Sequence, residues 1–262
     1  MRDQPARVGA EFGRRGISDV VGYVLVFSLV VSMVGIISVA GFTSLDSARN
    51  AEQVNNAERA FDVLADNMRD VHAKDAPSRA TEISLSEASL RTTGTVIMNV
   101  TARNTTTNDR FVFVIESDPI IWQGTKDTEV VYSSGAILRQ ENDGGVVIDG
   151  FPSQYDSERT VIRLVQLRAP QRQVGGTTVR VRAVGVSSEV VLGEETDTYD
   201  ELRLNITTPR AEIWRQHLER YPNTDCSIVT FPGTASETVT CTFSDRDSVY
   251  VTLARIDVSI EG

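Results

Sequence analysis

The stretch GRRGISDVVGYVLVFSLVVSMVGIISVAGF, from Gly13 to Phe42, decides how this chain is organised. No residue between Val20 and Leu45 is charged. A helix rises about 1.5 Å per residue, and the hydrocarbon core of a membrane is about 30 Å thick. The 23 residues from Val20 to Phe42 are therefore enough to cross it. We expect a membrane-spanning helix.

The charges on either side of this helix predict its orientation. Four arginines precede it, whereas the residues that follow it are mixed in sign. Segments with an excess of Lys and Arg stay in the cytoplasm. We therefore expect a single-pass protein of the cell membrane, with a cytoplasmic N-terminus and an extracellular C-terminal domain. A cleaved secretory signal is the alternative, because Ser38-Val39-Ala40 fits a small-x-small site, but the hydrophobic region of such signals is only about 7–15 residues long.

The string RRGISDVVG, residues 14–22, resembles the prepilin-type (class III) signal of archaeal type IV pilins, especially haloarchaeal ones. In that family a basic residue and a Gly or Ala stand before the cut, and the hydrophobic helix stays on the mature subunit. The resemblance implies that Arg14 and Arg15 are the basic residues of a leader. It also implies that a membrane-embedded prepilin peptidase cuts between Gly16 and Ile17. A plain anchor with two flanking arginines is the alternative.

Two later segments extend this resemblance. NNAERAFDVLADNM (55–68) and APSRATEISL (76–85) are similar to uncharacterised haloarchaeal pilin-like exoproteins. The composition is also unusual, because the chain holds 36 acidic against 26 basic residues, of which only two are lysines. An acidic, nearly lysine-free chain indicates a halophilic source; the alternative is that GC-rich codon usage alone replaced lysine with arginine. An acidic chain disfavours nucleic acid as a partner, since nucleic-acid binding relies on basic patches.

An amphipathic helix is expected to follow the membrane segment. Apolar residues recur at three- and four-residue spacings from Leu45 to Val71, with polar residues between them. The sequence Ala76-Pro77-Ser78 is expected to end the helix, because the residue before a proline disfavours helix. The apolar stripe has two interpretations. It packs on the sheet of its own domain, or it meets the same stripe of neighbouring subunits in a filament.

From Thr81 onward the hydrophobic period changes to two. Segments such as TVIMNVTA (95–102) and DELRLNIT (200–207) alternate apolar and polar residues, and turn signals such as Asn142-Asp143-Gly144-Gly145 separate the segments. Short strands spaced about ten residues apart are typical of an antiparallel β-sandwich. One short helix interrupts them, with Thr208 as the expected N-cap and Pro209 as its first residue.

The expected fold class is therefore α+β. It consists of a long N-terminal transmembrane and amphipathic helix, followed by an antiparallel β-sandwich-like extracellular domain with one short helix. We divide the chain into a basic cytoplasmic leader (1–16), a transmembrane helix (17–43), an amphipathic helical stalk (44–76) and an extracellular β-rich domain (77–262).

The last strand carries a change of parity. Its apolar residues are Val249, Val251 and Leu253, and then Ile256, Val258 and Ile260. A one-residue slip turns a strand's side chains to the other face. We therefore expect a β-bulge near Ala254-Arg255, which lets both halves face the same core.

Two cysteines and three sequons are the candidate modification sites. Cys226 and Cys241 flank a predicted hairpin, and outside the cell such a pair is expected to form a disulfide; two buried free thiols are the alternative. Asn99, Asn104 and Asn205 each begin an Asn-x-Thr sequon, which makes them candidate N-glycosylation sites on an exported chain.

The sequence contains no phosphate-binding glycine loop, no GxSxG elbow and no recognisable metal-ligand spacing. We expect no catalytic residue, no metal and no cofactor. The main hypothesis is a pilin-like structural or adhesive subunit. Its partners are then membrane lipid, prepilin peptidase and sister subunits that contact its N-terminal helix. The alternatives are an unprocessed single-pass protein with an extracellular binding module, and an anchored extracellular hydrolase.

Overall fold

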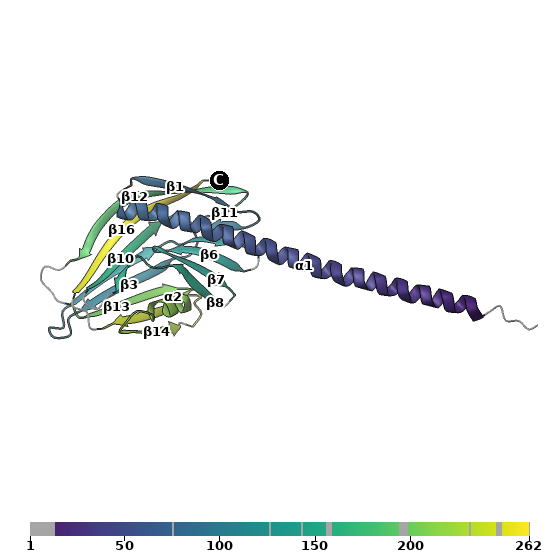
Figure 1. The fold of residues 1–262 in the computed structure, drawn as a ribbon. Coiled ribbons are helices and arrows are strands. Elements are labelled where there is room, and N and C mark those ends of the chain that lie inside the picture. Colours follow the sequence, from purple (N-terminus) through teal and green to yellow (C-terminus); the bar gives the residue numbers. More distant parts are fainter. Residues whose placement is uncertain are drawn as a thin grey trace, which may run out of the picture. The chain divides into compact units, whose positions relative to one another are not determined.

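The computed structural model describes residues 14–74, 76–125, 127–142, 144–155, 159–193, 199–230, 232–244 and 248–261 (Figure 1). The side chains of residues 14–19 and 159 are outside this description. The chain divides into two units, Met1–Ala51 and Glu52–Gly262, which are taken separately below. Helix α1 (Arg14–Ala73) supplies the described part of the first unit and the beginning of the second.

The second unit uses its part of α1 to close a hydrophobic core. The buried residues of the helix are Val54, Ala57, Phe61, Leu64, Met68 and Val71, spaced three or four apart as the sequence predicts, together with Ala65 beside Leu64. Two ion pairs fix the helix beside this stripe, Glu58 with Arg139 at 2.8 Å and Arg69 with Asp149 at 2.9 Å. Of the two interpretations of the stripe, packing on its own domain is confirmed from Val54 to Val71.

The strands of the second unit form three sheets. The order in sheet A is β1 (Ser78–Ser84), β12 (Thr178–Leu192), β16 (Ser248–Glu261), β10 (Arg159–Arg168) and β9 (Gln154–Tyr155). The order in sheet B is β11 (Gln173–Gly175), β2 (Ser89–Arg91), β5 (Ile120–Gln123), β6 (Thr128–Ser133), β7 (Ala136–Glu141) and β8 (Gly144–Asp149). The order in sheet C is β14 (Thr224–Thr230), β15 (Glu237–Phe243), β13 (Glu201–Thr208), β3 (Val96–Arg103) and β4 (Arg110–Ser117).

These sheets enclose two hydrophobic cores. The first core lies between sheet C with helix α2 (Ala211–Leu218) and one face of sheets A and B. The second core lies between the opposite face of sheets A and B and the stripe of α1. Sheets A and B are therefore a middle layer that is covered on both faces. The expected antiparallel β-rich domain with a short helix is confirmed, although β10 and β16 pair in parallel.

The prediction of a β-bulge in the last strand, β16, is wrong. β16 keeps an unbroken register with β10 from Ser248 to Asp257, and the two irregularities of its ladder with β12 lie on β12, where Val186 and Val191 are the extra residues. The two halves of β16 face different cores: Val249, Val251 and Leu253 belong to the first, and Ile256, Val258 and Ile260 to the second. Regular alternation in a strand between two cores produces the change of parity without a bulge.

The short helix also begins later than expected. Its N-cap is Arg210 rather than Thr208, and its first residue is Ala211 rather than Pro209. Thr208 remains in β13, where it pairs with Glu237, and its hydroxyl accepts a hydrogen bond from the Arg210 backbone N–H at 3.3 Å. The ladder with β15 therefore holds the residue that would otherwise cap the helix.

Candidate functional site

The apolar segment of α1, residues 20–45, is the first candidate site. Each of its large hydrophobic side chains is between 50% and 73% exposed. The described residues contain one helix that is long and apolar enough to cross a membrane, and it includes this segment. The Thr43 hydroxyl donates to the Val39 carbonyl at 2.9 Å, so this polar group is satisfied within the helix. This pattern suits a helix whose surroundings are lipid or other apolar helices.

The predicted leader lies at the beginning of the same helix. Arg14, Arg15, Gly16 and Ile17 are the first four residues of α1, and residues 1–13 are outside the described part of the chain. The cut between Gly16 and Ile17 therefore remains a prediction. The apolar stripe that the sequence predicts from Leu45 begins later in the structure. Leu45 is half exposed, and Val54 is the first buried residue of the stripe.

The predicted disulfide is confirmed. Cys226 on β14 and Cys241 on β15 are directly opposite each other, and their sulfurs are bonded. β14 is an edge strand of sheet C, so the bond ties this edge to the next strand. Closing a loop of 15 residues stabilises a fold by roughly 3 kcal/mol in the chain-entropy model.

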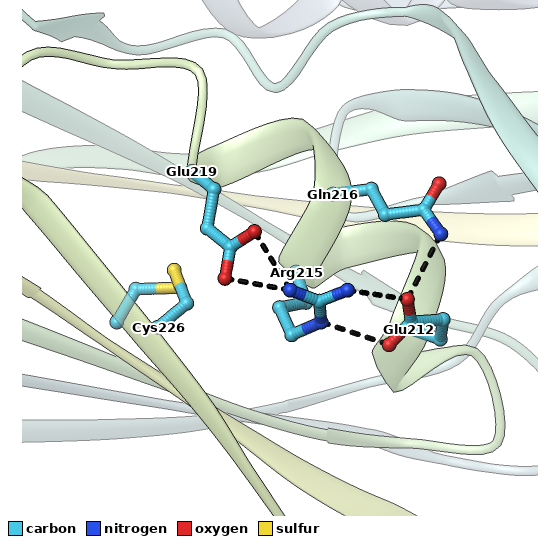
Figure 2. A network of polar contacts seen from close by, with 6 residues as sticks. Glu212, Arg215, Gln216, Glu219 and Cys226 are labelled. Carbon is cyan, nitrogen blue, oxygen red and sulfur yellow. Dashed lines mark hydrogen bonds and ion pairs between the residues drawn. A yellow bond between two sulfur atoms is a disulfide. The ribbon is translucent and has the colours of Figure 1, made fainter.

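Helix α2 carries a network of polar contacts on its outer side (Figure 2). Arg215 donates to Glu212 at 2.6 and 2.9 Å and to Glu219 at 2.7 Å, and Gln216 donates to Glu212 at 2.9 Å. The hydrogen bonds from Arg215 and Gln216 lower the pKa of Glu212 to about 2. All of these groups lie on α2 or on its C-cap residue Glu219, so the network reinforces this short helix.

Two of the three sequons lie inside sheet C. Asn99 on β3 and Asn205 on β13 are opposite each other in the ladder, and the side-chain oxygen of Asn205 is buried. Cβ atoms of opposite residues are only about 5 Å apart, so two glycans would not fit there in the folded sheet. Asn104 lies in the turn between β3 and β4, where its side-chain oxygen accepts hydrogen bonds from the backbone N–H groups of Thr106 (2.9 Å) and Thr107 (2.8 Å). Glycosylation remains a prediction at all three sites.

The two histidines lie on different helices, His72 on α1 and His217 on α2. Burial lowers the pKa of His72 to about 4, and the charges of Arg69 and Arg163 act in the same direction. Burial also lowers the pKa of His217, whose Nε2 is 3.4 Å from the Tyr221 hydroxyl. Within the described ranges no three His, Cys, Asp or Glu side chains are close enough together to hold a metal ion.

A cluster of two arginines and one glutamate is the feature that sequence reasoning missed. Arg91 on β2, Glu129 on β6 and Arg210 before α2 line a pocket of about 350 Å³. The Glu129 carboxylate accepts a hydrogen bond from Arg91 Nη2 at 2.5 Å and another from Arg210 Nη2. These residues are far apart in the sequence and belong to no motif, so no local signal could have identified the cluster.

Comparisons with known proteins give a family and no activity. Residues 15–259 match a family described as Family of unknown function (DUF7289). No curated protein and no solved structure matches the chain. The match extends from the second predicted leader arginine almost to the end of β16, so it includes the long apolar helix as well as the β-rich domain.

Proposed function

We propose a function for this chain, which belongs to the DUF7289 family of unknown function: it is a membrane-anchored surface protein of the type IV pilin-like kind, a structural or adhesive subunit. Prepilin peptidase removes its leader before Ile17. The segment 20–45 then stays in lipid until it contacts the same segment of sister subunits, and the β-rich domain lies outside the cell.

The difference between the two parts of α1 is the observation that carries this proposal. Between Val54 and Val71, the seven apolar residues of the buried stripe are at most 6% exposed, because the domain's own sheets cover them. From Val20 to Leu45 the large apolar side chains are at least half exposed. Burying one such side chain is worth about 1.5–3 kcal/mol, so 17 of them need a non-aqueous environment. Lipid supplies it for an anchor, and sister helices supply it for an assembled subunit.

Two further features support an extracellular domain. The Cys226–Cys241 disulfide is of a kind that persists in oxidising compartments and is rare in the cytosol. The excess of arginine before the helix favours a cytoplasmic N-terminus. Both features are equally consistent with an unprocessed single-pass protein, which is the second candidate. The arginine-lined pocket favours that candidate, because a binding module needs a site and a purely structural subunit does not.

Intact-mass measurement of the membrane-extracted protein tests leader removal. We expect the mature chain to begin at Ile17. Replacing Gly16 with Asp is expected to leave the leader attached, because the resemblance places a Gly or Ala before the cut. Gly22→Ala is the matched control, since an added Cβ at Gly22 has nothing within 4 Å. An intact leader on the unmodified protein contradicts the pilin-like proposal and leaves the single-pass anchor.

Electron microscopy of cells that produce the processed protein tests assembly. Filaments that contain the protein and disappear with G16D are the expected result for a major subunit. A processed protein that remains dispersed in the membrane contradicts self-assembly into filaments. Leader removal and assembly are therefore decided by separate measurements.

A further inference from the structure

The charges in the pocket beside Arg91 are unbalanced. Glu129 uses its two carboxylate oxygens separately, one for Arg91 and one for Arg210. These three residues are the charged groups among those that line the pocket, so its lining carries a net charge of +1. The chain as a whole has a formal net charge of −10. A positive pocket in an acidic protein favours an anion over a cation or a neutral ligand.

Arg210 is poorly compensated by the protein itself. Its side chain is only 6% exposed, and its Nε makes no hydrogen bond with the part of the chain that the structure describes. Burial lowers the pKa of Arg210, Glu129 opposes that effect, and the charge of Arg91 adds to it. Arginine nevertheless stays protonated in proteins. A buried donor without a partner costs about 1–3 kcal/mol, and a second anionic group in the pocket would reduce the cost of this buried charge.

The remaining lining residues are neutral, and some of them are polar. Thr93, Thr95, Ser236 and Gln140 contribute hydroxyl and amide groups, and Val96, Pro119 and Ile121 contribute apolar walls. Such groups recognise hydroxyls through hydrogen bonds, while arginine matches the planar geometry of a carboxylate. Ligand pockets have volumes of about 300–1,000 Å³, and this one, at about 350 Å³, has room for one monosaccharide-sized molecule.

We propose that this pocket binds a small polyhydroxylated carboxylate, a sugar acid, with its carboxylate at Arg91 and Arg210 and its hydroxyls at the neutral side chains. Glu129 holds the two guanidinium groups in place and leaves one positive charge for the ligand. The pocket lies between residues 91 and 236, apart from the leader residues, so it does not depend on leader processing.

Isothermal titration calorimetry of the full-length protein in detergent tests this proposal, with sodium glucuronate, glucose and acetate as probes. We expect glucuronate to bind, glucose to give no measurable binding, and acetate to bind at least tenfold more weakly than glucuronate. Arg91→Gln is expected to weaken glucuronate binding at least tenfold. Arg255→Gln is the matched control, because Arg255 is similarly exposed and pairs with Glu189 at 2.6 Å in sheet A. It is expected to change nothing.

A second variant keeps the test decisive if R91Q does not fold. Gln140→Leu removes a neutral lining group and retains all three charges. It is expected to weaken glucuronate binding several-fold and to leave acetate binding unchanged. The proposal is overturned if glucuronate does not bind, if glucose or acetate binds equally well, or if neither R91Q nor Q140L affects glucuronate. None of these outcomes bears on cleavage before Ile17.

Discussion

Replacing Phe61 with alanine tests whether α1 is a structural part of the domain. Phe61 is fully buried in the second core. Truncating a buried Phe to Ala costs about 3–5 kcal/mol, from lost transfer free energy and the cavity that remains. The total stability of a domain is only about 5–15 kcal/mol. For a domain of this size, the loss corresponds to a decrease in melting temperature of roughly 6–20 °C.

The matched control is Val63→Ala on the same helix. Val63 is 54% exposed, and truncation there is expected to change the free energy of unfolding by no more than about 0.5 kcal/mol. Tryptophan fluorescence during thermal unfolding in detergent measures both variants. Trp122 lies in the second core and Trp214 in the first, and both are buried, so one signal reports on both. Repeating it with W214F isolates the second core.

Equal melting temperatures for F61A and V63A would refute the reasoning. They would mean that the stripe of α1 lies on the sheets without stabilising them, and that the helix is only a connection. A large loss in both variants would point instead to a general sensitivity of the helix, which the exposure of Val63 does not predict.

Four further predictions follow from the same structure. A chain that begins at Glu52 is expected to be soluble and folded without detergent, whereas one that begins after Ala73 lacks the cover of its second core and is expected to be unfolded by circular dichroism. Cys226→Ser is expected to lower the free energy of unfolding by about 3 kcal/mol in urea titrations, and the unmodified protein with reductant should match it. Because the folded pKa of His72, about 4, lies below its ordinary value of 6.5, stability is expected to fall as the pH decreases from 6.5 to 4; His72→Gln should remove that part of the decrease in melting curves at several pH values. If the exported protein carries N-glycans, we expect Asn104→Gln to lower its intact mass. An intact mass that does not decrease would contradict the inference that Asn104, rather than Asn99 or Asn205 inside sheet C, carries the glycan.

The sequence predicts the outer elements of this fold well and the middle layer only in part. β3 and β13 alternate buried and less buried residues, because only one face of sheet C is covered. Their apolar residues therefore repeat with a period of two, from which strands can be predicted. β5 and β6 are buried on both faces, so IIWQ and TEVVYS show no alternation from which a strand could be predicted. β16 is also buried on both faces, and this produces the change of parity from which the sequence predicts a bulge.

The candidate sites divide in a similar way. The disulfide was predictable, since a hairpin places its cysteines opposite each other along a short stretch of sequence. The pocket of Arg91, Glu129 and Arg210 was not, because three segments form it only after sheets B and C have packed. α2 begins after Arg210 because Thr208 is held in the ladder between β13 and β15. The sequence gives no signal that the sheet, and not the helix, takes this residue.

Within the second unit, residues 52–73 of α1 are both the N-terminal element of the domain and the cover of its second core. A pull on the N-terminal end of this unit therefore acts first on the helix that carries Val54 and Phe61. The ion pairs of Glu58 and Arg69 lie along the same helix and resist sliding of the helix over sheet B. Such a domain would resist tension only as well as its helix holds to the sheets, so mechanical resistance and folding stability depend on the same contacts.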